Sequence, residues 1–296
     1  MLPEWLTIRP ASTAKYADVK SEISGLGLHT VCAEAHCPNI TECWSGGTAT
    51  FMVLGEKCTR GCRFCTVPKS AMGANIDPME PEKLGRIISK WKLDYAVITS
   101  VCRDDLPDQG SGHFARCVEE IKRSSPSTTI EVLIPDFRGD TECLERIVKS
   151  GPDVVGHNVE TVERLTPLMR DRRASYELSL GVLKKIKELD NTRYTKSALM
   201  LGVGETEEEV LKTLKDLRSV GTDFIAMGQY LRPSSRHIEV KEYVRPEKFD
   251  RLRDSAMKEG FLYAASGPFV RSSYKAGEFF IKAMVKKRAA EGKAQP

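Results

Sequence analysis

Short apolar runs alternate with helix-like segments through most of this 296-residue chain, which limits it to the repeating α/β architectures. Seven runs have the length and the Val, Ile and Leu content of strands buried on both faces. They are predicted at residues 49–55, 95–101, 129–137, 153–159, 196–203, 223–231 and 261–267. Repeated strand–helix units build a parallel sheet with right-handed crossovers. Six or seven such units favour a barrel or partial barrel over a flat, doubly wound sheet.

The segments between these runs have helical periodicity. Helices are predicted at residues 80–92, 112–123, 140–150, 173–189, 206–220, 246–258 and 274–290. Asp140 is placed as an N-cap, and Gly151 follows the end of the same helix. Thr206 and Glu209 have the spacing of a capping box.

The regular alternation begins near residue 49, and the segment before it looks irregular. We therefore predict three parts. They are an N-terminal extension over 1–48, a partial (β/α)6 TIM-like barrel over 49–235 and a C-terminal extension over 236–296.

Composition and charge argue against several classes of protein. Lys plus Arg number 45 and Asp plus Glu 41, and a net charge of +4 does not predict nucleic-acid binding. No apolar stretch reaches the roughly 18 residues of a transmembrane helix. Residues 1–10 lack the apolar region of a secretory signal peptide. We therefore expect a cytoplasmic protein with reduced thiols, which binds neither nucleic acid nor membrane.

The nine cysteines are unevenly distributed, and six of them lie between Cys32 and Cys65. The number of cysteines is odd, most of them are close together in the sequence, and a reducing compartment is expected. These three points favour metal or iron–sulfur ligation over disulfides. Cys117 and Cys143 lie on apolar helix faces and are expected in the core.

The motif Cys58-Thr-Arg-Gly-Cys62-Arg-Phe-Cys65 follows the first predicted strand directly. In parallel barrels this loop opens on the face where active sites are built. Three thiolates can hold three irons of a cubane cluster and leave the fourth iron open to a ligand. Arg60 and Arg63 are expected to offset the thiolate charge. The alternative is structural zinc, but zinc prefers four ligands in paired C-x2-C motifs, so the spacing favours iron–sulfur.

With Phe64 before its last cysteine, this motif resembles that of the radical S-adenosylmethionine (SAM) superfamily. The resemblance implies a 4Fe–4S cluster whose open iron binds the amino and carboxylate groups of SAM. It also implies cleavage of SAM to methionine and a 5′-deoxyadenosyl radical, which abstracts hydrogen from an unactivated carbon.

A second cysteine triad, Cys32, Cys37 and Cys43, lies in the N-terminal extension with C-x4-C-x5-C spacing. Three thiols suit a second cluster with one non-cysteine ligand; His36 is an awkward candidate because it adjoins Cys37. Upstream of the first motif, this spacing resembles that of the lipoyl synthase family. Other stretches that resemble the family are residues 35–39, 99–107, 157–161, 196–206, 228–234 and 271–274.

That resemblance implies insertion of two sulfur atoms, at C6 and C8, into an octanoyl chain. The chain is carried on a lysine of a lipoyl carrier domain or of a glycine-cleavage H protein. Two SAM molecules are consumed, and the second 4Fe–4S cluster supplies the sulfur. The resemblance also implies an electron donor such as ferredoxin or flavodoxin, and a protein that repairs the second cluster.

The resemblance assigns the fourth ligand of the second cluster to Ser273, with Ser272 as the alternative. The same two serines could instead cap the helix predicted over 274–290. SAM contacts are expected at strand ends that face the first cluster, although packing or turn formation explains each of them equally well. These residues are Phe64, Thr99, Ser100, Asn158, Glu160, Gly204, Glu205, Tyr230 and Arg232.

The run Arg103-Asp104-Asp105 follows the second predicted strand, and we expect it to organise the site through salt bridges. Cys102 before it departs from the acid or amide usual in the family. Two other hypotheses remain open. One is a radical SAM sulfurtransferase with another substrate, and the other is a zinc-stabilised binding module without catalysis.

Overall fold

The computed structural model describes residues 2–7, 21–23, 25–31, 39–40, 43, 50–272, 281, 283–285 and 288. Within these residues, eight strands form one sheet in chain order. The first pair is antiparallel and every later pair is parallel. The strands are β1 (His29–Thr30), β2 (Thr50–Val53), β3 (Tyr95–Ser100), β4 (Thr129–Leu133), β5 (Val154–Gly156), β6 (Tyr194–Leu201), β7 (Phe224–Gln229) and β8 (Tyr263–Gly267).

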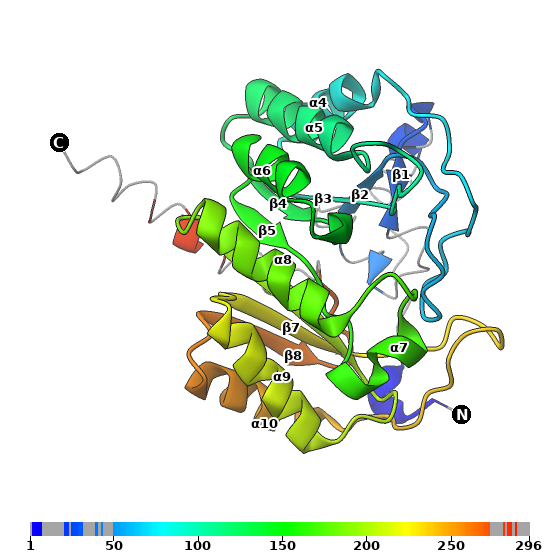
Figure 1. Cartoon of the computed structure of the whole chain (residues 1–296), viewed down its shortest axis with the longest axis vertical. Coiled ribbons are helices and arrows are strands. Elements are labelled where there is room, and N and C mark those ends of the chain that lie inside the picture. Colours follow the sequence, from blue (N-terminus) through cyan, green and yellow to red (C-terminus); the bar gives the residue numbers. More distant parts are fainter. Residues whose placement is uncertain are drawn as a thin grey trace.

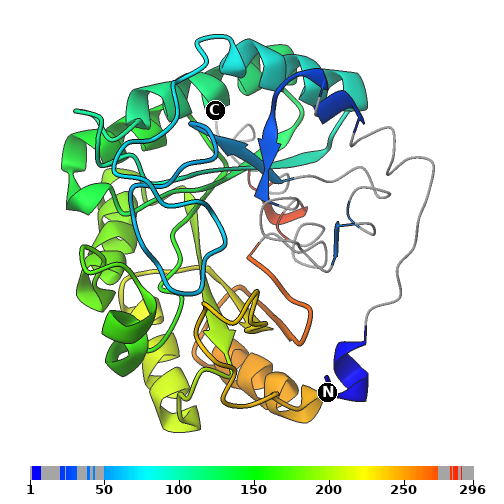
Figure 2. The ribbon, with the colours of Figure 1, turned by 90° about the vertical axis from the view of Figure 1, so that its right-hand side faces the viewer.

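The helices cover the outside of the sheet (Figure 1) and form an arc around it, from cyan α4 through green to orange α10 (Figure 2). They are α4 (Glu80–Trp91), α5 (Ser111–Ser124), α6 (Thr141–Lys149), α7 (Thr166–Met169), α8 (Tyr176–Leu189), α9 (Glu207–Ser219) and α10 (Pro246–Lys258). Short 3-10 turns are η1 (Glu4–Leu6), η2 (Phe137–Gly139) and η3 (Glu163–Leu165). Because no bonds between described residues join β1 to β8, the sheet is an open, partial TIM-like barrel, as predicted.

The seven predicted strands correspond to β2–β8, and six predicted helices correspond to α4, α5, α6, α8, α9 and α10. Asp140 accepts a hydrogen bond from the Cys143 N–H, and the Thr206–Glu209 capping box is present. β1 and α7 were not predicted, because two or four residues are too few to show a period. The helix predicted over 274–290 lies mostly outside the described residues. The domain boundaries at residues 48 and 235 remain predictions. The β/α repeat continues beyond residue 235, because α10 and β8 follow it.

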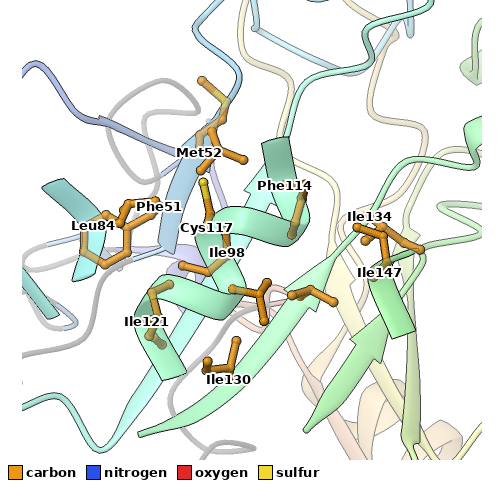
Figure 3. Close-up of a cluster of buried hydrophobic side chains, with 14 of the residues drawn as sticks. Phe51, Met52, Leu84, Ile98, Phe114, Cys117, Ile121, Ile130, Ile134 and Ile147 are labelled. Atoms are coloured by element: carbon orange, nitrogen blue, oxygen red, sulfur yellow. The ribbon is translucent and has the colours of Figure 1, made fainter. Parts of the chain in front are cut away.

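Buried side chains between β2–β4 and the helices α4–α6 form one large hydrophobic cluster (Figure 3). Phe51, Leu84, Phe114 and Ile121 are each almost fully buried in it. Both Cys117 and Cys143 are buried in this cluster, which confirms that they are core residues. Since this packing fixes the strands against their helices, it also fixes the positions of the loops at the strand ends.

A smaller cluster closes the amino-terminal end of the barrel. The first residues of several strands, among them Tyr95, Val154, Tyr194 and Phe224, pack with the buried Ile281. Functional residues are therefore expected at the opposite, carboxyl-terminal end. No helix in the described part of the chain combines the length and the apolar character that crossing a bilayer requires.

Candidate active site

A cavity of about 630 Å³ opens at the carboxyl ends of the barrel strands. This volume is that of a small-molecule site. Ten of the residues predicted to bind the first cluster or SAM line this cavity. They are Cys58, Cys62, Phe64, Cys65, Thr99, Ser100, Asn158, Glu160, Tyr230 and Arg232.

The loop after β2 presents its three cysteines to this cavity, and the end of α7 and the segment after it hold the loop in place. The Arg63 N–H donates to the Met169 carbonyl at 2.7 Å, and the Gly61 N–H donates to the Asp171 carboxylate at 2.8 Å. The Asp171 N–H in turn donates to the Cys62 sulfur at 3.4 Å. Three thiols on one side of a cavity, with no fourth cysteine in the same loop, fit a 4Fe–4S cluster with one open iron.

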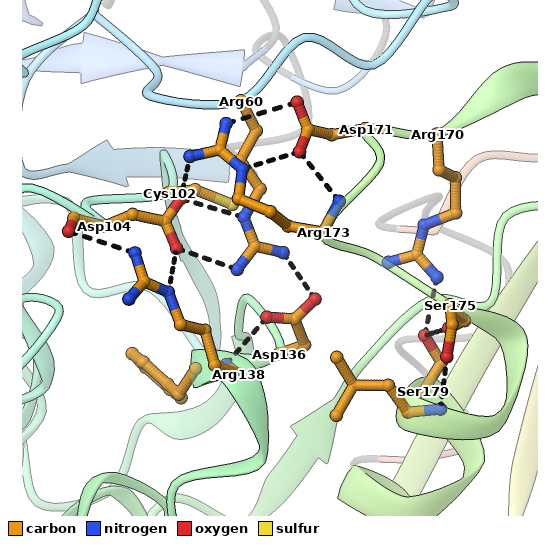
Figure 4. A network of polar contacts seen from close by, with 12 residues as sticks. Arg60, Cys102, Asp104, Asp136, Arg138, Arg170, Asp171, Arg173, Ser175 and Ser179 are labelled. Carbon is orange, nitrogen blue, oxygen red and sulfur yellow. Dashed lines mark hydrogen bonds and ion pairs between the residues drawn. The ribbon is translucent and has the colours of Figure 1, made fainter. Parts of the chain in front are cut away.

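A buried network of ion pairs supports the cysteine loop (Figure 4). The Arg60 guanidinium donates to Asp104 at 2.9 Å and to Asp136 at 2.5 Å. Burial by itself would raise the pKa of Asp104, but the hydrogen bonds and charge of Arg60 outweigh it and hold that pKa well below its usual range. The run after β3 therefore organises the site through salt bridges, as predicted. Besides these two carboxylates, Arg60 also acts on a cluster cysteine: the pKa of Cys58 is lowered mainly by its hydrogen bond with Cys102 and further by the Arg60 charge, which agrees with the expectation that Arg60 offsets thiolate charge.

Cys102 lines the cavity beside the first cysteine loop. Its thiol hydrogen-bonds with Cys58, which lowers the pKa of Cys58 and raises that of Cys102. Its carbonyl accepts the N–H and the hydroxyl of Thr59, each at 3.0 Å. Cys102 thus contacts a predicted cluster ligand.

Among the predicted SAM contacts, Ser100 has the most telling environment. Its hydroxyl is buried and has no hydrogen-bond partner in the described part of the chain. The hydroxyls of Thr99 and Tyr230 instead donate to the carbonyls of Leu133 and Ile238. An unpartnered buried hydroxyl in a cavity is costly unless a ligand satisfies it.

Two cavity residues after β5 form a polar pair. The Asn158 amide donates to the Glu160 carboxylate at 3.2 Å. Burial raises the pKa of Glu160, and the Arg170 charge opposes that rise. Glu160 also has a positive φ of 68°, which is uncommon for a residue other than glycine and often marks functional sites.

Gly204 and Glu205 do not line the cavity. The Glu205 carboxylate accepts the N–H groups of Gly202 at 2.6 Å and Val203 at 3.0 Å. This side chain closes its own turn after β6. Arg232 is exposed, and its guanidinium donates to the carbonyls of Ser235 and His237 within its own loop.

Sequence reasoning missed Arg170, which lines the cavity with 9% of its surface exposed. One guanidinium nitrogen donates to Ser179, whereas its buried Nε has no partner among the described residues. Burial raises the pKa of nearby Cys62, and the charge of Arg170 opposes part of that rise. No motif contains this arginine, and only the cavity reveals it.

Parts of both predicted extensions reach one side of the same cavity. Cys43 is buried and lines it, and so does Ser272. Nearby, the Asn39 amide donates to the Phe269 carbonyl at 2.8 Å, which joins the two extensions directly. The other predicted ligands of the second cluster, Cys32, Cys37 and Ser273, lie outside the described residues.

Residues 52–217 match the Radical SAM superfamily, so the barrel and its cysteine loop define a radical SAM enzyme. Solved structures agree on the fold. The FeFe-hydrogenase maturase of Carboxydothermus hydrogenoformans has a TM-score of 0.57 at 12% identity, over 74% of this chain and 53% of that one. Methylornithine synthase has a TM-score of 0.54 at 12% identity, over 83% of this chain and 75% of the other.

Curated relatives are far more similar in sequence. The mitochondrial lipoyl synthase of Aedes aegypti is 52% identical over 295 residues, which cover 98% of this chain and 75% of the relative. That of Vitis vinifera is 53% identical over 96% of this chain and 74% of the relative. The chain belongs to the lipoyl synthase family. Enzymes of this kind use SAM and 4Fe–4S clusters, which the cysteine donor set fits.

The expectation of a cytoplasmic protein is wrong. These relatives are named as mitochondrial enzymes, and one from Toxoplasma gondii, 49% identical, is named as an apicoplast enzyme. The lack of an apolar region in residues 1–10 argued only against a secretory signal. Transit peptides to organelles are amphipathic and contain no such region, so that observation could not separate the two compartments.

Proposed function

We propose that this lipoyl synthase inserts two sulfur atoms, at C6 and C8, into an octanoyl chain on a lysine of a lipoyl carrier domain or a glycine-cleavage H protein. Two SAM molecules yield two methionines and two 5′-deoxyadenosines for each lipoyl group. One observation carries the proposal: a single cavity is lined by the cysteine loop after β2 and by Cys43 and Ser272 of the two extensions.

Cys58, Cys62 and Cys65 would hold the 4Fe–4S cluster that, when bound and reduced, supplies the electron for SAM cleavage. Arg170 and Ser100 have unsatisfied donors in the cavity, which suit the carboxylate of SAM. Asn158 and Glu160 suit its ribose hydroxyls. The apolar wall around Phe64 would exclude water from the radical.

Cys32, Cys37 and Cys43 would hold the second cluster, with Ser273 as its fourth ligand and Ser272 as the alternative. A serine oxygen is a harder ligand than a thiolate, so it would release its iron more readily. Ready release suits a cluster that is consumed as the sulfur source.

Lipoyl synthases act on lipoyl-carrier proteins. We extend this to two further partners, an electron donor such as ferredoxin or flavodoxin and a protein that rebuilds the second cluster.

The test separates the two clusters by mutation. Cys62→Ala should abolish 5′-deoxyadenosine formation, whereas Cys37→Ala should leave SAM cleavage intact and stop lipoyl formation. Anaerobically reconstituted wild-type protein should contain about eight irons and eight sulfides per chain, and each variant about four. Lipoyl product from Cys37→Ala would contradict the second-cluster assignment. Zinc without sulfide would contradict the proposed reaction.

A further inference from the structure

Five exposed cationic side chains surround the mouth of the cavity, and we call them the cationic rim. They are Arg63, Lys69, Arg172, Arg232 and Arg236. Lys69 and Arg232 themselves line the cavity.

The loops that carry the rim touch one another, so the rim is a continuous surface. The backbone N–H of Arg63 donates to the carbonyl of Met169 at 2.7 Å. This bond joins the cysteine loop to the segment that carries Arg172. The Arg63 carbonyl accepts the Ile238 N–H at 3.4 Å. A ring nitrogen of His237, next to Arg236, lies 3.2 Å from the Cys65 carbonyl.

None of the five rim cations forms an ion pair with a carboxylate in the described part of the chain. The carboxylates on the same loops are already engaged. Asp171 pairs with Arg173 at 2.7 Å, Glu239 with Lys241 at 3.2 Å and Glu242 with Lys248 at 3.2 Å. The rim therefore carries a net positive charge, although the chain as a whole is only mildly basic.

Two large apolar side chains are exposed near the rim, Met72 on the loop after β2 and Leu168 in α7. Met72 is 70% exposed and Leu168 is 46% exposed. The Leu168 carbonyl accepts a hydrogen bond from the Arg63 guanidinium at 3.5 Å, which places this leucine beside the rim. Exposed apolar residues within a field of one charge are typical of a protein-binding surface.

We propose that the cationic rim is the docking surface for the folded, octanoylated lipoyl carrier protein, and that it binds an acidic face around the octanoylated lysine. This inference rests on the proposed function. A protein-bound octanoyl chain can enter the cavity only if the folded carrier sits on its mouth, and the rim surrounds that mouth. Complementary charge would steer the carrier and orient its lysine arm.

The double variant Arg172→Glu/Arg236→Glu tests the proposal, because both residues lie outside the cavity lining. We expect at least about a tenfold weaker Kd for an octanoylated carrier domain at low ionic strength, measured by fluorescence anisotropy. The difference from wild type should shrink at high ionic strength, where the charges are screened. The complementary change is made in the carrier domain, where the acidic residues beside the octanoylated lysine are replaced by lysine. This carrier should bind the rim variant more tightly than it binds the wild-type enzyme.

A short octanoyl-lysine peptide separates this proposal from the proposed function. The rim variant should convert the peptide with wild-type kinetics, because no folded carrier has to dock. The matched control, Arg86→Glu/Lys215→Glu, reverses two exposed cations on the outer helices α4 and α9 and should bind the carrier as wild type does.

Wild-type protein that cannot convert the peptide would refute the proposed function. Conversion of the peptide, with equal carrier affinity in the rim variant and wild type, would refute the docking surface alone. If the wild type binds RNA or anionic vesicles through the rim and the carrier elsewhere, the docking proposal is also refuted.

Discussion

At the scale of single residues, Arg170 shows how burial gives a side chain a role. A guanidinium keeps its charge at every accessible pH, so placing it inside a protein is costly without anionic partners. The hydrogen-bond partner of Arg170 among the described residues is the neutral Ser179 hydroxyl, and its Nε lacks one. The nearby Glu160 carboxyl, whose pKa is raised by burial, forms no ion pair with it. An anionic ligand in the cavity, such as the carboxylate of SAM, would satisfy both the charge and the free donor.

Arg170→Met should therefore weaken SAM binding by about tenfold to a hundredfold, the loss of one charge-assisted hydrogen bond of about 1.5–3 kcal/mol. Equilibrium dialysis of SAM with the reconstituted protein measures this. Arg172→Met, two residues further on and exposed, is the matched control and should bind SAM normally. Equal SAM affinity in both variants would remove Arg170 from the site.

At the scale of elements, the segment after β8 is held between β7 and the N-terminal extension. A Cβ on Gly228 would lie 2.0 Å from the Val270 carbonyl oxygen, so only glycine allows this close approach to β7. On its other side the segment accepts the Asn39 hydrogen bond at Phe269. Ser272 follows directly, so these contacts position the predicted serine ligand.

Gly228→Ala should displace residues 270–272, because backbone atoms cannot yield as a flexible side chain can. We expect a loss of about 1–3 kcal/mol in the stability of the apoprotein and iron content that falls from about eight toward about four per chain. Thermal unfolding and iron analysis test both. Gly181→Ala in α8, where a Cβ has open space, should be neutral or slightly stabilising. Full iron content in Gly228→Ala would contradict the positioning role.

At the scale of the whole molecule, the barrel is closed at its base and open at its mouth, and buried polar groups lie between the two ends. His157 is one of them. Its Nδ1 lies 2.9 Å from the Ile134 carbonyl, and its Nε2 lies 3.0 Å from the Ser179 hydroxyl. Burial, reinforced by the Arg170 charge, lowers the pKa of His157 from 6.5 to about 4.

The unfolded chain therefore binds this proton more tightly than the folded one. The stability of the apoprotein should fall as pH falls from about 6.5 toward about 4, with a loss of about 2 kcal/mol at pH 5 from this group. Denaturant unfolding between pH 7 and pH 5 measures the slope. His157→Gln should flatten this slope. An unchanged slope in His157→Gln would show that other groups control the acid sensitivity.

Sequence alone determined the β/α repeat, the helix caps and the cysteine loop, because each is written in neighbouring residues. Apolar periodicity specifies which face of an element is buried, and C-x3-C-x2-C places three thiols within a single loop. The spacing of Cys32, Cys37 and Cys43 likewise indicated a second cluster, whereas Ser273 could be linked to it only through the family resemblance.

Only the tertiary structure decided which distant residues share the cavity. Asn39 and Phe269 are 230 residues apart in the chain, and Arg173 contacts the Thr59 carbonyl across 114 residues. Sequence periodicity carries no information on such pairs, since they depend on how the elements pack. For the same reason Arg170 was missed, and Glu205 was predicted to contact SAM although its carboxylate closes its own turn. The cationic rim also required the fold, because its charges come from three loops that meet only at the mouth of the barrel.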